Sequence, residues 1–70
     1  MIKVIKAEKA AEILKANGYT SANAEKIKMG LEQRVYPFGD AIQMSKRMVY
    51  DIYEKKLMKW IQERDSDNTA

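Results

Sequence analysis

Few residues in this chain have side chains suited to catalysis. The 70 residues contain no histidine and no cysteine, which removes the commonest general base, any thiolate nucleophile and the usual zinc ligands. The three glycines are far apart and form no phosphate-binding loop. Ser21 and Ser45 have no histidine to activate them. Glu8 and Glu12 could bind a hard cation, but paired surface charges on a helix explain them better. The sequence therefore predicts no enzymatic activity, no cofactor and no small-molecule substrate.

The side chains with recognisable chemistry are amides and cations of the kinds that contact nucleic acids. Amides pair bidentately with adenine, and lysine reaches the acceptors of guanine. The candidates for base readout are Asn23, Lys26 and Gln33. Cations, hydroxyls and amides also contact phosphates and narrow minor grooves. The candidates for the DNA backbone or minor groove are Ser21, Lys28, Arg34, Gln43, Ser45, Lys46 and Arg47. Ordinary solvated surface positions are the alternative for both sets.

The base-readout candidates fall on the outer face of a helix expected over residues 22–33. Three apolar or small residues are expected beside them on that face. Ala22 and Gly30 have small side chains or none, which would allow this face of the helix to approach DNA closely. Met29 is unusual there, since it could touch a thymine methyl group or mark a contact with another protein.

The charge of the chain favours a polyanionic partner. The net charge is +3, and residues 1–64 hold all 13 basic residues but only eight of the ten acidic ones. A compact basic body suits nucleic acid or a membrane surface, although solubility alone is the simpler reading. No run of residues is long and apolar enough for a membrane span, and the N-terminus does not have the pattern of a signal peptide. The expected location is cytoplasmic, with no membrane partner.

The elements that must position these residues follow from periodicity. Residues 2–5 predict a short strand against a hairpin. Apolar residues at helical spacing predict a helix over 7–16, which Asn17 and Gly18 end. A second helix is expected over 22–33, capped by Thr20 or Ser21. Strand-like segments at 41–44 and 48–52 surround a reversal at 45–47, longer than a two-residue turn. Helical periodicity returns from Glu54.

These elements predict one α+β domain, a small winged helix-turn-helix with three helices and a two- or three-stranded antiparallel sheet. The domain is expected over 1–64, followed by a disordered polar tail over 65–70. The aromatic residues are expected to pack the hairpin onto the first and third helices: Tyr36, Phe38, Tyr50, Tyr53 and Trp60. Methionines 44, 48 and 58 are expected to fill gaps in the core.

Several segments together resemble a known group of proteins. They are residues 10–14 (AAEIL), a turn with Ser21 opening a second helix, residues 36–45 (YPFGDAIQMS) and residues 49–53 (VYDIY). This pattern, over about residues 5–61, resembles small phage and mobile-element proteins of the excisionase type, within the MerR-like winged-helix group. The resemblance implies binding to double-stranded DNA, with the helix at 22–33 in the major groove and the wing at 43–47 in the minor groove.

The expected function is therefore that of an excisionase-like recombination directionality factor or a small phage transcriptional regulator. The resemblance also implies cooperative binding with further copies of itself and an integrase as partner. The main alternative is a protein-interaction module, an anti-repressor or adaptor that uses the same winged-helix face. A purely structural phage component is a third possibility.

Overall fold

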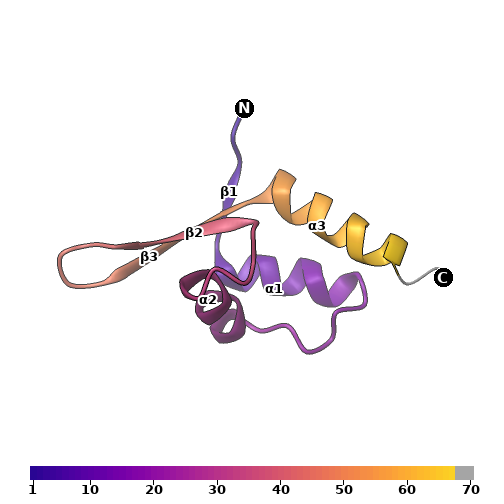
Figure 1. The fold of residues 1–70 in the computed structure, drawn as a ribbon, viewed down its shortest axis with the longest axis horizontal. Helices are drawn as coiled ribbons and strands as arrows, with labels where there is room; N and C mark the ends of the chain where they lie inside the picture. The colour runs from indigo at the N-terminus through magenta and orange to yellow at the C-terminus, as the bar shows by residue number, and fades with distance from the viewer. Residues whose placement is uncertain (68–70) are drawn as a thin grey trace.

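The computed structural model describes residues 1–67 as three helices and a three-stranded sheet. In chain order the elements are β1 (Val4–Ile5), α1 (Ala7–Ala16), α2 (Ala24–Glu32), β2 (Gly39–Gln43), β3 (Met48–Tyr53) and α3 (Glu54–Asp67). The hairpin of β2 and β3 extends from the body on the side away from the far end of α3 (Figure 1). The fold is the predicted α+β arrangement, and we call this hairpin, with its loop at residues 44–47, the wing.

β3 is the central strand of the sheet. The strand order is β1-β3-β2 and both pairings are antiparallel. Val4 lies opposite Tyr53, which confirms a short N-terminal strand against the hairpin, although it covers only Val4–Ile5 and not all of residues 2–5. At the other edge the ladder runs from Gly39 opposite Ile52 to Gln43 opposite Met48. Four residues therefore connect β2 and β3, a longer reversal than a two-residue turn, as predicted.

α1 has the predicted bounds because its sequence specifies both its face and its end. Ala7, Ala10, Ala11 and Leu14 are all buried, at the spacing of one helical face. At the end of α1, Gly18 has a φ of 97°, and the Tyr19 N–H donates to the Leu14 carbonyl at 2.9 Å. This is the left-handed helix ending that glycine favours.

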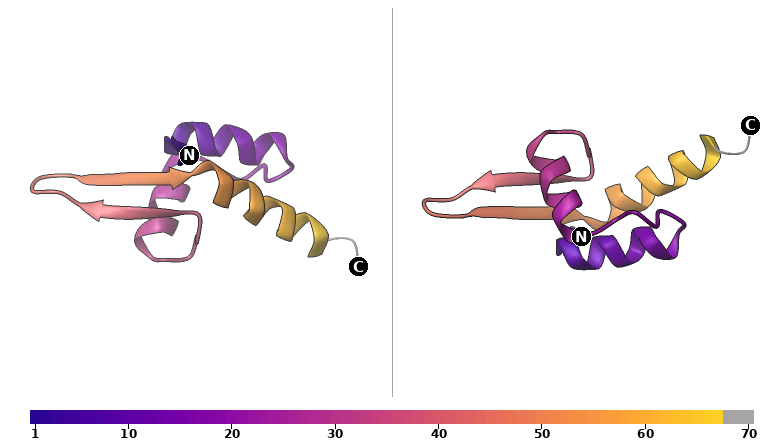
Figure 2. Two further views of the ribbon diagram at one scale, coloured as in Figure 1. Left: turned by 90° about the horizontal axis from the view of Figure 1, so that it is seen from above. Right: turned by 90° about the horizontal axis from the view of Figure 1, so that it is seen from below.

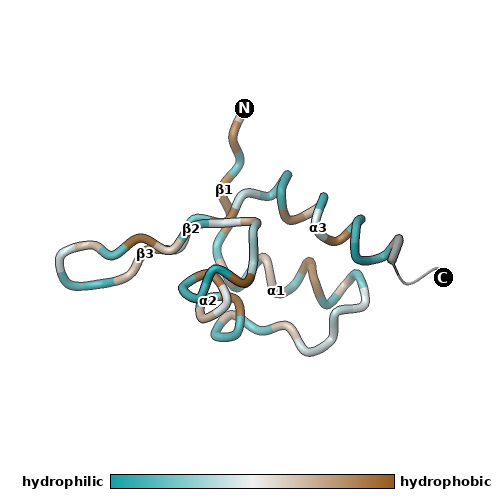
Figure 3. The backbone as a smooth tube through the Cα atoms, viewed as in Figure 1, coloured by the Kyte–Doolittle hydropathy of each residue, from teal (hydrophilic) through white to brown (hydrophobic). Residues whose placement is uncertain are grey.

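The core lies between the two N-terminal helices, the sheet and α3 (Figure 2). Phe38 is its largest fully buried side chain. Its ring stacks on Tyr36 at a centroid distance of 5.1 Å and meets the edge of Trp60 at 5.5 Å. These three aromatic residues therefore hold the start of the wing against α3, as predicted. Figure 3 shows hydrophilic residues in the wing loop, outside this core.

The other two aromatic predictions were wrong in part. Tyr50 is half-buried against the core, but its hydroxyl donates to Glu32 and so ties β3 to α2. Tyr53 donates its hydroxyl to Asp40 of β2 at 2.8 Å. Neither hydroxyl therefore bonds to the first or third helix, although Lys56 of α3 lies over the Tyr53 ring at 5.8 Å.

Two methionines and the chain end also differ from expectation. Met44 and Met58 are about half exposed and do not fill core gaps, while Met48 is partly buried. The core positions are instead occupied by residues that include Phe38, Ile52 and Leu57. α3 continues to Asp67, past the expected start of the tail at 65, and residues 68–70 lie outside the described residues. Among residues 1–67, no helix is long and apolar enough to cross a membrane.

Candidate nucleic-acid interface

Asn23 begins α2, and its side chain is committed to that role. Its backbone is extended, with φ −153° and ψ 165°, and its Oδ1 accepts from the Lys26 N–H at 2.8 Å. This bond satisfies one of the free N–H groups of the first helical turn. The predicted caps, Thr20 and Ser21, were wrong, and α2 begins two residues later than expected. Bidentate pairing with adenine uses the same amide oxygen, so Asn23 would have to share or give up this capping bond to read adenine.

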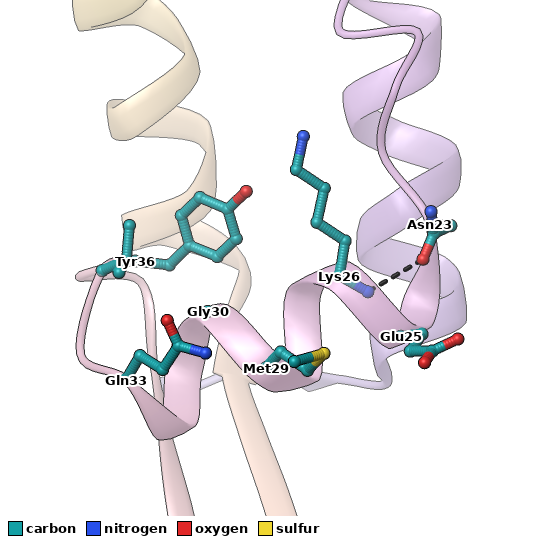
Figure 4. Close-up of a pocket in the computed structure, with 8 residues that line it drawn as sticks. Asn23, Glu25, Lys26, Met29, Gly30, Gln33 and Tyr36 are labelled. Carbon is teal, nitrogen blue, oxygen red and sulfur yellow. Dashed lines mark hydrogen bonds between the residues drawn. The ribbon is translucent and has the colours of Figure 1, made fainter.

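The Lys26 side chain is also engaged by neighbours within the protein. Its Nζ donates to Ser21 Oγ at 3.1 Å and lies 4.8 Å from the centre of the Tyr19 ring. The Tyr19 hydroxyl in turn contacts that of Tyr36 at 3.0 Å. Figure 4 shows the Lys26 side chain directed away from Met29. This local network brings the predicted residues Ser21 and Lys26 together, but with each other rather than at a reading surface.

The surroundings of this network move the pKa values of its two phenols in opposite directions. The nearby Lys26 cation lowers the pKa of Tyr19. Burial, with the contact to Tyr19, raises the pKa of Tyr36 to about 12. Tyr36 therefore stays protonated at neutral pH and acts as a neutral hydrogen-bonding group.

Ala22 and Gly30 do not slim the outer face of α2, which corrects the sequence interpretation. Ala22 precedes the helix and is almost fully buried. A Cβ atom on Gly30 would overlap the ring of Tyr36, so the absence of a side chain there admits Tyr36 rather than a ligand. The helical wheel does not apply to Ala22, which precedes α2. At Gly30 it could not include the ring of Tyr36, which comes from the segment after the helix.

The outer face of α2 presents Met29 and Gln33 instead. Ile27 and Leu31 are buried on the core side, whereas Met29 is 51% exposed on the opposite side. A shallow hollow beside this stripe is lined by Met29, Gly30, Val35 and Tyr36, with Gln33 at its end (Figure 4). Val35 is 62% exposed and was missed by sequence reasoning, since no periodicity marks a residue that follows the helix.

A second hollow separates α2 from the wing. Arg34 and Gln43, both predicted at the DNA backbone or minor groove, line it together, as do Glu32 and Asp40. The two carboxylates accept hydrogen bonds from Tyr50 and Tyr53, and these bonds raise the pKa of each phenol. The acidic side chains beside Arg34 are therefore engaged by neutral donors within the protein.

Arg34 occupies a backbone conformation that normally belongs to glycine. Its φ is 59°, and it is the single non-glycine residue with positive φ among the described residues. The Val35 N–H donates to the Gly30 carbonyl at 2.8 Å and the Arg34 N–H to the Leu31 carbonyl at 3.2 Å. A left-handed conformation costs a residue with a Cβ atom about 1–2 kcal/mol. An arginine at this helix end thus carries strain that a glycine would not.

The wing carries the remaining predicted cations. Ser45, Lys46 and Arg47 form the exposed part of its loop. The loop is held by the Met44 N–H, which donates to the Arg47 carbonyl at 2.7 Å, and by Gln43 Nε2, which donates to the Met44 carbonyl at 2.9 Å. Gln43 thus supports the loop and keeps its Oε1 available.

Most of the basic charge in the described part of the chain is not paired with acid. Within residues 1–65, the ion pair of Lys3 Nζ with Glu54 Oε2 at 3.2 Å is the only salt bridge. Lys28 lies over the ring of Tyr50 at 5.6 Å, on the flank of α2 that faces β3. Lys28, Arg34 and the wing cations are therefore free to contact phosphates.

Comparison with protein-family models, curated proteins and solved structures found no match to this chain.

Relieving the strain at Arg34 should make the protein more stable and, at the same time, weaken its binding to DNA. The Arg34→Gly variant is expected to raise the free energy of unfolding by about 0.5–1 kcal/mol, because the left-handed cost of 1–2 kcal/mol outweighs the extra backbone entropy of glycine. It should also weaken binding to duplex DNA through the lost cation. Urea unfolding and anisotropy check the two effects, and Arg34→Lys should change neither stability nor binding strongly. A less stable Arg34→Gly variant would contradict the strain argument.

Asn23 is expected to act through the helix and not through the bases. Asn23→Ala should lower the free energy of unfolding by about 1 kcal/mol, the usual cost of losing an N-cap, and Asn23→Ser should restore most of it. Urea unfolding followed by circular dichroism measures both. If Asn23→Ser changes the preferred DNA sequence while the stability is kept, Asn23 reads a base after all.

Proposed function

We propose that this protein binds double-stranded DNA as an excisionase-like recombination directionality factor or a small phage transcriptional regulator. The observation that carries the proposal is the projecting wing, whose loop has the exposed cations Lys46 and Arg47, together with the hollow between the wing and α2, which Arg34 lines. In this proposal α2 enters the major groove, and the wing contacts the minor groove or the backbone.

The dimensions of the elements support this arrangement. α2 has nine residues, about 13.5 Å of helix at 1.5 Å per residue, which is close to the roughly 12 Å width of the major groove. Winged-helix proteins place such a helix and their hairpin on neighbouring grooves, with the intervening phosphates between them. Here Arg34 and Gln43 line the hollow between the two elements, where a cation and an amide could bond phosphate oxygens.

Fluorescence anisotropy at two salt concentrations tests the proposal. The probes are a random duplex and a duplex from the region that flanks the gene of this protein. Salt-sensitive binding with preference for the flanking region would support a recombination or regulatory factor. Further copies of the chain and an integrase are proposed as partners at such a site, and a binding curve steeper than a single-site isotherm would support cooperation between copies.

A protein partner is the second candidate, and the outer face of α2 favours it. Met29 and Val35 are exposed there, and Glu25 lies beside Met29 in the same hollow. An apolar patch edged by acidic side chains suits a protein surface better than a phosphate backbone. Weak binding, equal for both duplexes, would support an anti-repressor or adaptor.

A further inference from the structure

The reading surface of α2 is reduced by the contacts within the protein. Asn23 Oδ1 is bonded to the Lys26 N–H, and Lys26 Nζ is bonded to Ser21 and covers Tyr19. These contacts engage one candidate for adenine and the candidate for guanine within the protein, so each would have to share or give up a bond to read a base. The exposed side chains on the outer stripe are then Glu25, Met29 and Gln33, at intervals of four residues (Figure 4). Residues at this spacing are neighbours on a helix, about 5–6 Å apart at Cβ.

The chemistry of Met29 and Gln33 is specific. Met29 lies in a hollow that has an apolar part, formed with Gly30, Val35 and the ring of Tyr36, and a polar part formed by Asn23, Glu25, Lys26 and Gln33. An apolar group would bury carbon surface against the apolar part. The thymine 5-methyl is the one apolar group that a base pair presents in the major groove. Gln33 carries an amide, which matches the N6 donor and N7 acceptor of adenine.

Resting on the DNA-binding function proposed above, we infer that α2 recognises an A·T-containing step. Met29 and its hollow receive a thymine 5-methyl group, and the Gln33 amide pairs with adenine N6 and N7. Arg34, which directly follows Gln33, and Lys28, on the flank of α2, supply the positive charge that a neighbouring phosphate requires. The specificity of the site therefore comes from one apolar contact and one amide, while the cations set its general affinity.

Uracil substitution isolates the apolar contact, because uracil differs from thymine by the methyl group alone. The probe is the duplex that the protein enriches from a random library, with each thymine replaced by uracil in turn. At one thymine the affinity should fall about 4-fold, the effect of one buried carbon group. In the Met29→Ala variant the same replacement should have no effect. Gln33→Ala should lose roughly 10-fold of the preference for adenine beside that thymine.

Met58→Ala is the matched control, since Met58 is a similarly exposed methionine on α3. This variant should bind like the wild type and keep its sensitivity to uracil. Tight DNA binding with no preferred site, or with equal affinity at every uracil position, overturns the inference and leaves DNA binding standing. Absence of DNA binding altogether overturns both proposals, and the hollow at Met29 then belongs to a protein interface.

Discussion

Replacing Phe38 with alanine is expected to abolish most of the folded population. Phe38 is fully buried and contacts the rings of Tyr36 and Trp60, so the variant leaves a cavity where β2, α3 and the aromatic residues meet. Such a change costs about 3–5 kcal/mol. Domains have about 0.05–0.15 kcal/mol of stability per residue. The total free energy of unfolding of a 70-residue chain is therefore similar in size to the cost of this substitution. Thermal unfolding followed by circular dichroism measures the loss.

Val35→Ala is the control for the Phe38 prediction. Val35 lies three residues earlier and is largely exposed, so its truncation should change the free energy of unfolding by no more than about 0.5 kcal/mol. The expected order is therefore a near-native Val35→Ala variant and a largely unfolded Phe38→Ala variant. Equal stability of the two would show that the aromatic core does not hold the wing to the body.

The second large effect is expected at the wing loop. Changing Lys46 and Arg47 together to alanine should weaken binding to duplex DNA on the order of 10- to 100-fold at low salt, since a hydrogen bond to a charged group contributes about 1.5–3 kcal/mol and these side chains are exposed. Each lost phosphate contact also removes about 0.9 from the slope of log affinity against log salt. The slope should therefore fall by about one to two units, measured by anisotropy over a salt series.

A matched pair of cations separates this effect from the loss of net charge. Lys15 lies in the last turn of α1 and Lys59 lies within α3, and both elements run away from the wing (Figure 1). The Lys15→Ala/Lys59→Ala variant loses the same charge as the wing variant. It should keep nearly the whole salt slope. A wing variant that behaves like this control removes the wing from the interface.

The sequence predicted those elements whose local pattern agrees with their packing. α1 combines one apolar face with an Asn-Gly ending, so both its type and its bounds were right. The hairpin had β-branched and aromatic residues on both sides of a polar reversal, and its position was right within two residues at each end. In both cases short-range chemistry and long-range burial favour the same structure.

The details of the site depend on contacts that a helical wheel does not contain. Asn23 was placed on an outer face, but an asparagine beside a helix start can turn its side chain back to the backbone, and here it caps α2. Gly30 was assigned to close approach by a ligand, whereas its real neighbour is Tyr36. Arg34 follows α2 and Gln43 ends β2. They come together at one hollow only because α2 packs against β2 in the folded chain.

The order of the strands also decides when this chain can fold during its synthesis. β1 pairs with the last residues of β3, so Val4 cannot pair until Tyr53, 49 residues later in the chain, has been synthesised. Leu57, fully buried, comes later still. A nascent chain that ends before these residues has neither a central strand complete enough to hold β1 nor a third helix to cover Phe38. The domain must therefore form in one late, cooperative event rather than element by element as translation proceeds.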